Sequence, residues 1–172
     1  MTDMVFTQAF VEWIDLLHYQ LVTKDDVQVV TDHGETTYYV HYDDSSYTLT
    51  ETQCSHHEDF LMSGKDAVDV ERYLTWLMGS SIRGLRGLPF LYHAWKPSDI
   101  RPGWSASRVA SHWVLHDPHG PDRATFHDCD DAVTYSWIAD VRTEDVRASY
   151  MDPNGLPLFP GCWIGPMKPD PQ

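Results

Sequence analysis

The sequence has little of what marks several common protein classes. Its 172 residues include three cysteines, Cys54, Cys129 and Cys162, and an odd number at wide spacing is not a disulfide framework. No apolar run approaches the roughly 20 residues that a membrane span needs. The N-terminus has no basic stretch followed by an apolar run, as a secretory signal has. We therefore expect a cytoplasmic protein with reduced thiols and no membrane segment.

Positive charge is also scarce. There are 12 Lys and Arg residues against 26 Asp and Glu residues, which gives a formal charge of −14. Such an anion is repelled by nucleic-acid phosphates and by anionic membrane surfaces, so neither is an expected partner. The charge instead favours solubility and a basic protein partner. Because 42% of the residues are hydrophobic, we expect one folded domain over 1–172, with an irregular Pro/Gly-rich tail at 160–172.

Catalytic and cofactor-binding motifs are missing. The sequence has no Gly-x-Ser-x-Gly elbow, Walker loop or dinucleotide fingerprint. His112 and His116 share a predicted strand face, but at ~3.3 Å per residue they lie about 13 Å apart, too far to chelate one metal ion. Cys54 with His56 and His57 lacks a second ligand pair at zinc-site spacing. We expect no catalytic residue, cofactor or metal, and no enzyme. A small His-rich enzyme or ligand-binding domain stays open as an alternative.

The periodicity of the apolar residues predicts an α+β fold. Steps of three and four residues predict a helix over 6–21, and similar stripes predict helices at 66–79 and 129–139. A short helix at 143–149 and a short strand at 156–159 are expected near the end. Segments rich in β-branched and aromatic residues, separated by polar turns, predict two antiparallel meanders, 27–29, 36–42 and 46–52 followed by 104–109, 111–116 and 123–127. This order predicts an antiparallel sheet packed with about three to four helices in a single domain.

One segment has the opposite charge to its surroundings. Gly79, Gly84 and Gly87, with Pro89 just beyond, predict a loop over 79–90. It lies in 73–101, where basic residues outnumber acidic residues, whereas 1–72 and 102–172 are both net acidic. Arginine among apolar side chains is the composition of interface hot spots. We predict that this loop protrudes and binds a partner through Ser80, Ser81, Ile82, Arg83, Gly84, Leu85, Arg86, Gly87 and Leu88. The alternative is that Arg83 and Arg86 pair with carboxylates of the acidic body.

The sequence also resembles a known family. The motifs that carry the resemblance are Phe10-Val11-Glu12-Trp13, Asp69-Val70-Glu71-Arg72-Tyr73-Leu74, Gly79-Ser80-Ser81-Ile82-Arg83, Arg86-Gly87-Leu88-Pro89 and the run 150–159, Tyr-Met-Asp-Pro-Asn-Gly-Leu-Pro-Leu-Phe. In order and spacing they are similar to the immunity protein 61 family, over roughly residues 10–160. None of them is a catalytic signature.

The resemblance implies a function in binding. The family consists of cytoplasmic antidotes encoded beside polymorphic toxins in actinobacteria. It implies that this chain binds the catalytic domain of a cognate toxin, in a 1:1 complex, and inhibits it by covering its active site. The resemblance points to an NAD glycohydrolase as that toxin. A nuclease toxin stays open as an alternative target, because an acidic surface can mimic nucleic acid. The family has no catalytic or cofactor-binding residues to carry over.

Overall fold

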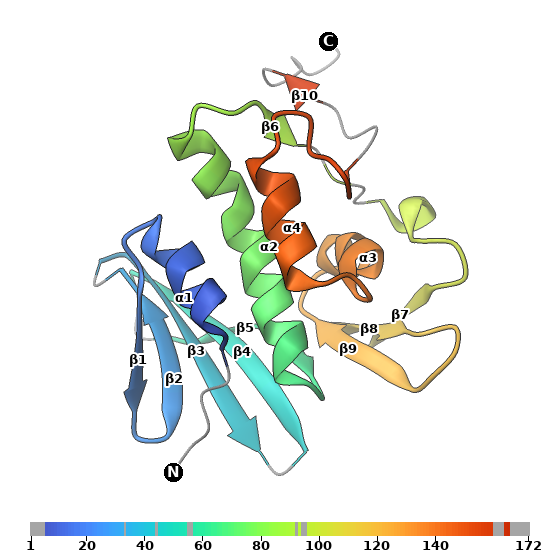
Figure 1. Cartoon of the computed structure of the whole chain (residues 1–172). Helices are drawn as coiled ribbons and strands as arrows, with labels where there is room; N and C mark the ends of the chain where they lie inside the picture. Colours follow the sequence, from blue (N-terminus) through green and yellow to red (C-terminus); the bar gives the residue numbers. More distant parts are fainter. Residues whose placement is uncertain are drawn as a thin grey trace.

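A computed structural model of the chain shows an antiparallel sheet with helices packed on it (Figure 1). The structure describes residues 6–32, 34–43, 45–54, 57–91, 93, 96–159 and 164–165. Four α-helices have the bounds α1 Gln8–Asp15, α2 Ala67–Leu85, α3 Cys129–Ile138 and α4 Thr143–Met151. A short 3₁₀ helix, η1, spans Pro97–Asp99. The predicted α+β class is confirmed.

The sheet has eight strands in the order β1-β2-β3-β4-β5-β9-β8-β7. Their bounds are β1 Gln20–Lys24, β2 Val27–Thr31, β3 Thr36–Asp43, β4 Ser46–Gln53, β5 Asp59–Gly64, β7 Ser105–Val109, β8 His112–His116 and β9 Asp122–Phe126. The two predicted meanders are therefore parts of one sheet, joined where β5 pairs with β9. A separate two-stranded ribbon pairs β6, Phe90–Leu91, with β10, Ile164–Gly165.

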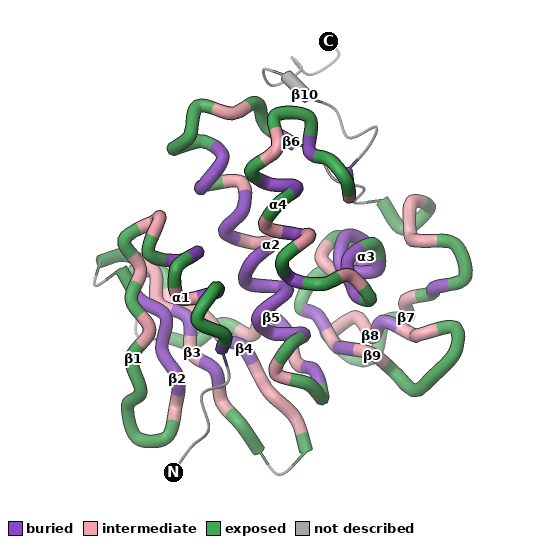
Figure 2. Tube along the Cα trace, viewed as in Figure 1, coloured by how far each residue is buried: buried purple, intermediate pink, exposed green. Residues whose placement is uncertain are grey.

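Helix α2 lies at the centre of the core. Along it Val70, Tyr73, Leu74, Met78 and Ile82 are buried, and Figure 2 shows this buried stretch between the sheet and α4. Helix α4 packs along α2, while α3 covers the β8 and β9 part of the sheet. Burying one apolar stripe per helix is what the three- and four-residue periodicity predicts. Among the helices of the described residues, none combines the length and apolar character needed to cross a membrane.

Two predicted boundaries are wrong, each for a local reason. Helix α1 begins as expected, with the Thr7 hydroxyl accepting a hydrogen bond from the Phe10 N–H at 3.2 Å. It ends at Asp15 instead of near residue 21, and His18 takes the left-handed conformation, with φ 62°, before β1. The predicted strand at 156–159 is a series of turns, which follows Gly155 at φ 71°.

The predicted loop over 79–90 is the largest correction. Helix α2 continues through Gly79 and ends at Leu85. Gly79 lies within the helix and does not end it. A glycine is needed here because a ring of α4 packs against this position. A Cβ at this position would lie 2.5 Å from ring atoms of Tyr150. Only residues after Leu85 leave the helix, and Gly87, at φ 65°, makes the turn toward β6.

Candidate functional site

Arg83, predicted to be an exposed contact residue, is completely buried. Its guanidinium donates hydrogen bonds to five backbone carbonyl oxygens: Pro89 at 2.7 Å, Ser149 at 3.4 Å, Tyr150 at 2.7 Å, Asp152 at 2.6 Å and Pro153 at 3.1 Å. The last carbonyls of a helix lack partners within it, and Arg83 supplies donors to those at the end of α4. The expected alternative, pairing with carboxylates, is also wrong for this residue, since its partners are carbonyl oxygens.

The hydrogen bonds of Arg83 join three segments at one end of the molecule. These are the end of α2, the β6 segment and the turn after α4, which lie together at the top of Figure 1. Gly155 packs directly against Leu91, since a Cβ at Gly155 would lie 2.8 Å from a methyl carbon of that leucine. The Asp152 carboxylate accepts hydrogen bonds from the N–H groups of Asn154 and Leu156, at 2.8 and 3.1 Å. The backbone of this end is therefore held by many internal contacts.

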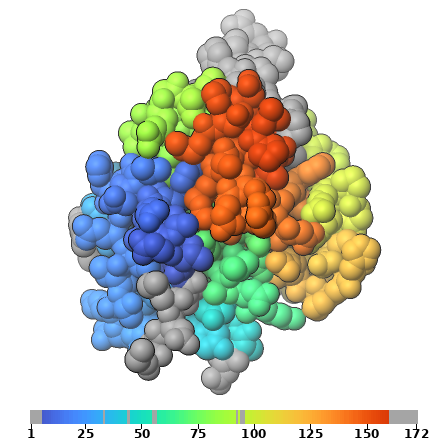
Figure 3. Space-filling view, in the orientation of Figure 1, coloured from blue at the N-terminus to red at the C-terminus, as the bar shows by residue number. Residues whose placement is uncertain are grey.

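The side chains that this end presents are mostly apolar. Leu85 is 67% exposed, Phe90 51% and Leu156 48%, and Arg86 is exposed between the first two in sequence. We refer to these four side chains as the α2 tip. In Figure 3 the green end of α2 and the red segment after α4 lie side by side at the same end. The sequence prediction missed Phe90 and Leu156, although the Asp-Pro-Asn-Gly turn before Leu156 was visible in it.

The nine residues predicted to contact a partner fall into two groups. Ile82 and Arg83 are buried inside the molecule and cannot touch a partner directly. Seven are exposed or partly exposed and lie together, namely Ser80, Ser81, Gly84, Leu85, Arg86, Gly87 and Leu88. The first four of these are on the last turns of α2 and the others follow it, so a helix end replaces the predicted loop.

The charge of this end differs from that of the remaining chain. Segments 80–91 and 149–159 contain Arg83, Arg86 and Asp152 as their only charged residues, whereas the other described residues include 22 acidic and nine basic side chains. Five of those basic side chains, Arg72, Arg101, Arg123, Arg142 and Arg147, already bind carboxylates of the chain. The surface away from the tip is therefore strongly acidic.

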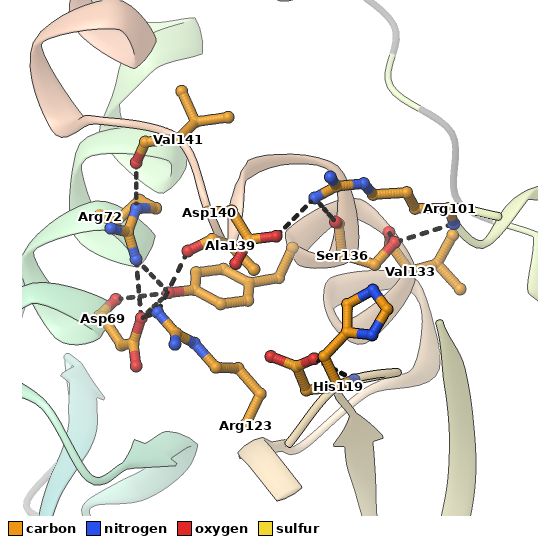
Figure 4. A network of polar contacts seen from close by, with 12 residues as sticks. Asp69, Arg72, Arg101, His119, Arg123, Val133, Ser136, Ala139, Asp140 and Val141 are labelled. Atoms are coloured by element: carbon orange, nitrogen blue, oxygen red, sulfur yellow. Dashed lines mark hydrogen bonds and ion pairs between the residues drawn. The ribbon is translucent and has the colours of Figure 1, made fainter. Parts of the chain in front are cut away.

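A second polar cluster lies at the opposite end of α2 (Figure 4). One oxygen of the buried Asp69 carboxylate accepts hydrogen bonds from Arg72, Arg123 and Tyr135, each at 2.7 Å. Arg72 and Arg123 also donate to backbone carbonyl oxygens, those of Val141 and Ala139. Because all of these partners belong to the chain itself, the cluster ties α2, β9 and α3 together and has the character of a structural network.

A partly buried carboxyl close to this network has a shifted pKa. Asp131 of α3 accepts a hydrogen bond from the Tyr73 hydroxyl at 2.6 Å. Burial, with the nearby charges of Asp130 and Asp128, raises the pKa of Asp131 to about 6, although the Tyr73 hydrogen bond acts in the opposite direction. Its hydrogen-bond partner Tyr73 is a buried core residue of α2, so this carboxyl takes part in the packing of α3 on α2.

The histidines are spread over separate places. His41 pairs with Glu58 at 2.8 Å, His116 pairs with Asp122 at 2.6 Å, and the His112 ring packs edge-on against Phe60. Within the described residues, no three His, Cys, Asp or Glu side chains are grouped as metal ligands. His56 of the Cys54 motif lies outside the described residues. The structure thus does not bring the candidate histidines together.

Comparison with known proteins assigns the chain to a class. A family model described as immunity protein 61 matches residues 13–158. The chain belongs to this family of immunity proteins. Two curated relatives are the "Immunity factor for TNT" of Mycobacterium tuberculosis and its homolog in Mycobacterium bovis. Each is 24% identical over 157 residues, which cover 86% of this chain and 89% of the relative.

A solved structure shares the fold. The protein titled "Rv3902c from M. tuberculosis" superimposes with a TM-score of 0.85 at 24% sequence identity, and the match covers 95% of this chain and 98% of that one. The family model ends at residue 158, so it includes the Arg83 hydrogen bonds and the turn after α4. The end of the molecule that carries the tip is thus within the part of the chain that defines the family.

Proposed function

We propose that this chain neutralises a cognate toxin by binding the catalytic domain, in a 1:1 complex in the cytoplasm, and covering the active site. Membership of the immunity protein 61 family supports a toxin as the partner. The family resemblance and the relatives named as immunity factors for TNT support an NAD glycohydrolase as its activity. The α2 tip is the observation that supports covering of the active site, because it is an apolar, arginine-bearing surface on an otherwise acidic protein.

The predicted contact segment remains part of this proposal in a corrected form. Ser80, Ser81, Gly84, Leu85, Arg86, Gly87 and Leu88 would face the toxin, whereas Ile82 and Arg83 would act from inside by holding the backbone. Arg86 is then the arginine available to the toxin, because it is exposed. Its rigid fork of five donors suits bidentate binding of a carboxylate in a partly dry site.

Tight binding is expected, since one unbound toxin molecule turns over substrate repeatedly. Nanomolar affinity corresponds to about −12 kcal/mol, and a standard interface buries on the order of 1,600 Å² in total. The acidic body should also accelerate association with a basic toxin surface. On-rates should then fall between 50 mM and 500 mM salt, because the Debye length is about 10 Å already at 0.1 M.

The test is co-expression of the chain with the toxin domain encoded beside its gene, followed by purification. A stable complex is expected, and adding the chain to the free toxin domain should stop NAD consumption at a stoichiometry of one to one. A dissociation constant in the micromolar range, or no complex, would contradict the proposal.

A nuclease toxin is the second candidate target, favoured by the acidic surface alone. Incubating the same toxin domain with NAD and with plasmid DNA or total RNA separates the two candidates. NAD loss with intact nucleic acid supports the first, and cleaved nucleic acid with intact NAD supports the second.

A further inference from the structure

We propose that the α2 tip is the surface that enters the toxin, and that it fits a concave apolar site with carboxylate groups at its rim. This inference rests on the proposed function. It adds which segments of the chain form the contact surface together and what chemistry the toxin's site has. Leu85 and Arg86 at the end of α2 lie within six residues of Phe90 in β6, whereas Leu156 is distant from all three in sequence. The structure brings them to one end of the molecule.

The backbone of the α2 tip is fixed before binding. The carbonyl oxygens of Pro89 and Pro153 bind the same guanidinium, which places the β6 segment beside the turn after α4. Gly155 packs on Leu91, so the turn that carries Leu156 is packed on the β6 segment that carries Phe90. A rigid binding surface loses little conformational entropy when a complex forms, and this raises affinity.

Exposed apolar side chains gather at the α2 tip. Nine large hydrophobic residues in the described chain are exposed, and three of them belong to the α2 tip, namely Leu85, Phe90 and Leu156. The other six are scattered over six elements: Val22 in β1, Tyr42 in β3, Val68 at the start of α2, Val109 in β7, Trp137 in α3, and Met151 in α4, where it lines a groove with α1. Grouped exposed apolar residues mark binding surfaces, whereas single ones are normal. A site that covers these side chains together has to be apolar and to surround the end of the helix, so we expect it to be concave.

The charge of the α2 tip indicates the chemistry of the partner's site. Arg86 is the exposed cation of this end, and the nearby Asp152 carboxylate already accepts two backbone hydrogen bonds. A partner with carboxylates at the rim of its site would pair with Arg86. A second copy of this chain is a poor occupant, because pairing two tips would bring two Arg86 side chains together. The acidic body would also repel itself.

The experiment compares tip variants with matched controls elsewhere on the surface. The tip variants are Leu85→Gln, Leu156→Gln and Arg86→Gln. The controls are Val68→Gln, at the other end of the same helix, and Arg108→Gln on β7. Circular dichroism and thermal melts establish that each variant is folded. Binding of the full chain to the neighbouring toxin domain is measured by calorimetry or surface plasmon resonance.

Leu85→Gln and Arg86→Gln should each weaken binding by roughly thirtyfold, as loss of a hot-spot side chain does, and chiefly by faster dissociation. Leu156→Gln should weaken it in the same direction. The two controls should stay within about threefold, because single surface changes outside an interface have small effects. Arg86→Glu should bind at least tenfold more weakly than Arg86→Gln, since like charges at an interface are strongly unfavourable.

Three results would overturn this inference alone, and a fourth would overturn the proposed function with it. If the tip variants are folded and bind like wild type while wild type binds the toxin, the tip is not the contact surface and the proposed function stands. If Arg86→Glu equals Arg86→Gln, the partner's site has no carboxylate rim. If light scattering shows that the free chain is a dimer that tip variants convert to a monomer, the occupant is a second copy. Absence of binding by wild type would overturn the proposed function and this inference together.

Discussion

The two ends of helix α2 both bury arginine, but they satisfy it differently. Near the start of the helix, Arg72 binds the buried carboxylate of Asp69, which also binds Arg123 and Tyr135. Near its end, Arg83 binds backbone carbonyl oxygens of residues on either side of it in space, without a carboxylate. One end is therefore a network of side chains, and the other is a set of backbone groups gathered around one side chain.

The difference shows what each end can do. A network of charged side chains joins elements but requires every member to be present, since removing one leaves buried charge without a partner. Carbonyl oxygens are present whatever the sequence, so the end around Arg83 fixes the backbone and leaves the outward side chains free to serve another purpose. This is the end that carries the exposed Leu85, Phe90 and Leu156.

The largest effect is expected at the Asp69 network. Asp69→Asn keeps the shape but removes the negative charge beside Arg72 and Arg123, so the free energy of unfolding should fall by about 3–5 kcal/mol. Urea denaturation measures it. The control is Asp145→Asn, which breaks a pair with Arg142 that is largely exposed, and should cost less than about 1 kcal/mol. Equal costs for the two variants would show that the buried network contributes no more than a surface ion pair.

A somewhat smaller loss is expected when Arg83 is replaced. Arg83→Met leaves the carbonyl oxygens at the end of α4 without donors, at a cost of about 3 kcal/mol, since each buried unsatisfied group costs ~1–3 kcal/mol and some would gain water. Arg86→Met should change the free energy of unfolding by less than about 0.5 kcal/mol, because that side chain is exposed. The pair is compared by thermal and urea denaturation. If Arg83→Met unfolds no more easily than Arg86→Met, the buried hydrogen bonds do not hold this end.

Two glycines of α2 should respond in opposite directions. Gly79→Ala places a methyl group 2.5 Å from the Tyr150 ring and should destabilise the fold by about 2 kcal/mol through overpacking. Gly84→Ala meets nothing within 4 Å and should stabilise it by about 0.5 kcal/mol, less than the full interior preference for alanine because Gly84 is in the last turn of α2. Differential scanning calorimetry gives both values. A stabilising Gly79→Ala would contradict the close packing of α2 on α4.

The smallest effect is a pH dependence of the free energy of unfolding, with opposite signs for two groups near the two ends of α2. In the folded chain the pKa of Asp131 is raised from its ordinary 3.8 to about 6, chiefly by burial. The stability from keeping this group neutral is complete below pH 3.8 and is lost as the pH rises through about 6. Asp131→Asn keeps an acceptor for Tyr73 and does not ionise. Between pH 4 and pH 7 its free energy of unfolding should therefore rise relative to that of wild type, by on the order of 1 kcal/mol. A constant difference across this range in urea melts would contradict the assignment.

His93, near the Arg83 end, should behave in the opposite way. Burial, and next the charge of Arg83, lowers the pKa of His93 to about 4, and its ring bonds the Tyr150 hydroxyl at 2.8 Å. The neutral ring is stable in the fold above pH 6.5, and that stability is lost as the pH falls toward 4. His93→Gln should remove this acid sensitivity. If the variant and wild type lose stability in parallel on acidification, His93 is not its source.

Local patterns in the sequence predicted most of the elements. The start of α1, the α3 and α4 helices and the strands of both meanders follow from apolar period and turn residues. The β5–β9 pairing could not be predicted, because it joins strands about 60 residues apart and depends on tertiary packing. Strands β1 and β5 lack a strong alternating pattern and were not predicted.

The candidate site shows where local reasoning fails. Gly79 predicts a helix end in isolation, and only the Tyr150 ring packed against it explains why α2 continues. Arg83 and Arg86 are both followed by Gly-Leu, but Arg83 lies within α2 and is buried, whereas Arg86 follows the last helical residue and is exposed. The exposed Phe90 and Leu156 are joined to the site by backbone hydrogen bonds to Arg83, for which the sequence carries no signal.

The hydrogen bonds of Arg83 have a consequence for how binding specificity can change. They run to main-chain oxygens, so the frame that they build does not depend on which side chains occupy positions 85, 86, 90 and 156. Different residues at these four positions can then be displayed on one unchanged backbone. Under the proposed function, exchanging the tip residues would adapt the chain to a new toxin surface without the repacking that a substitution in the core demands.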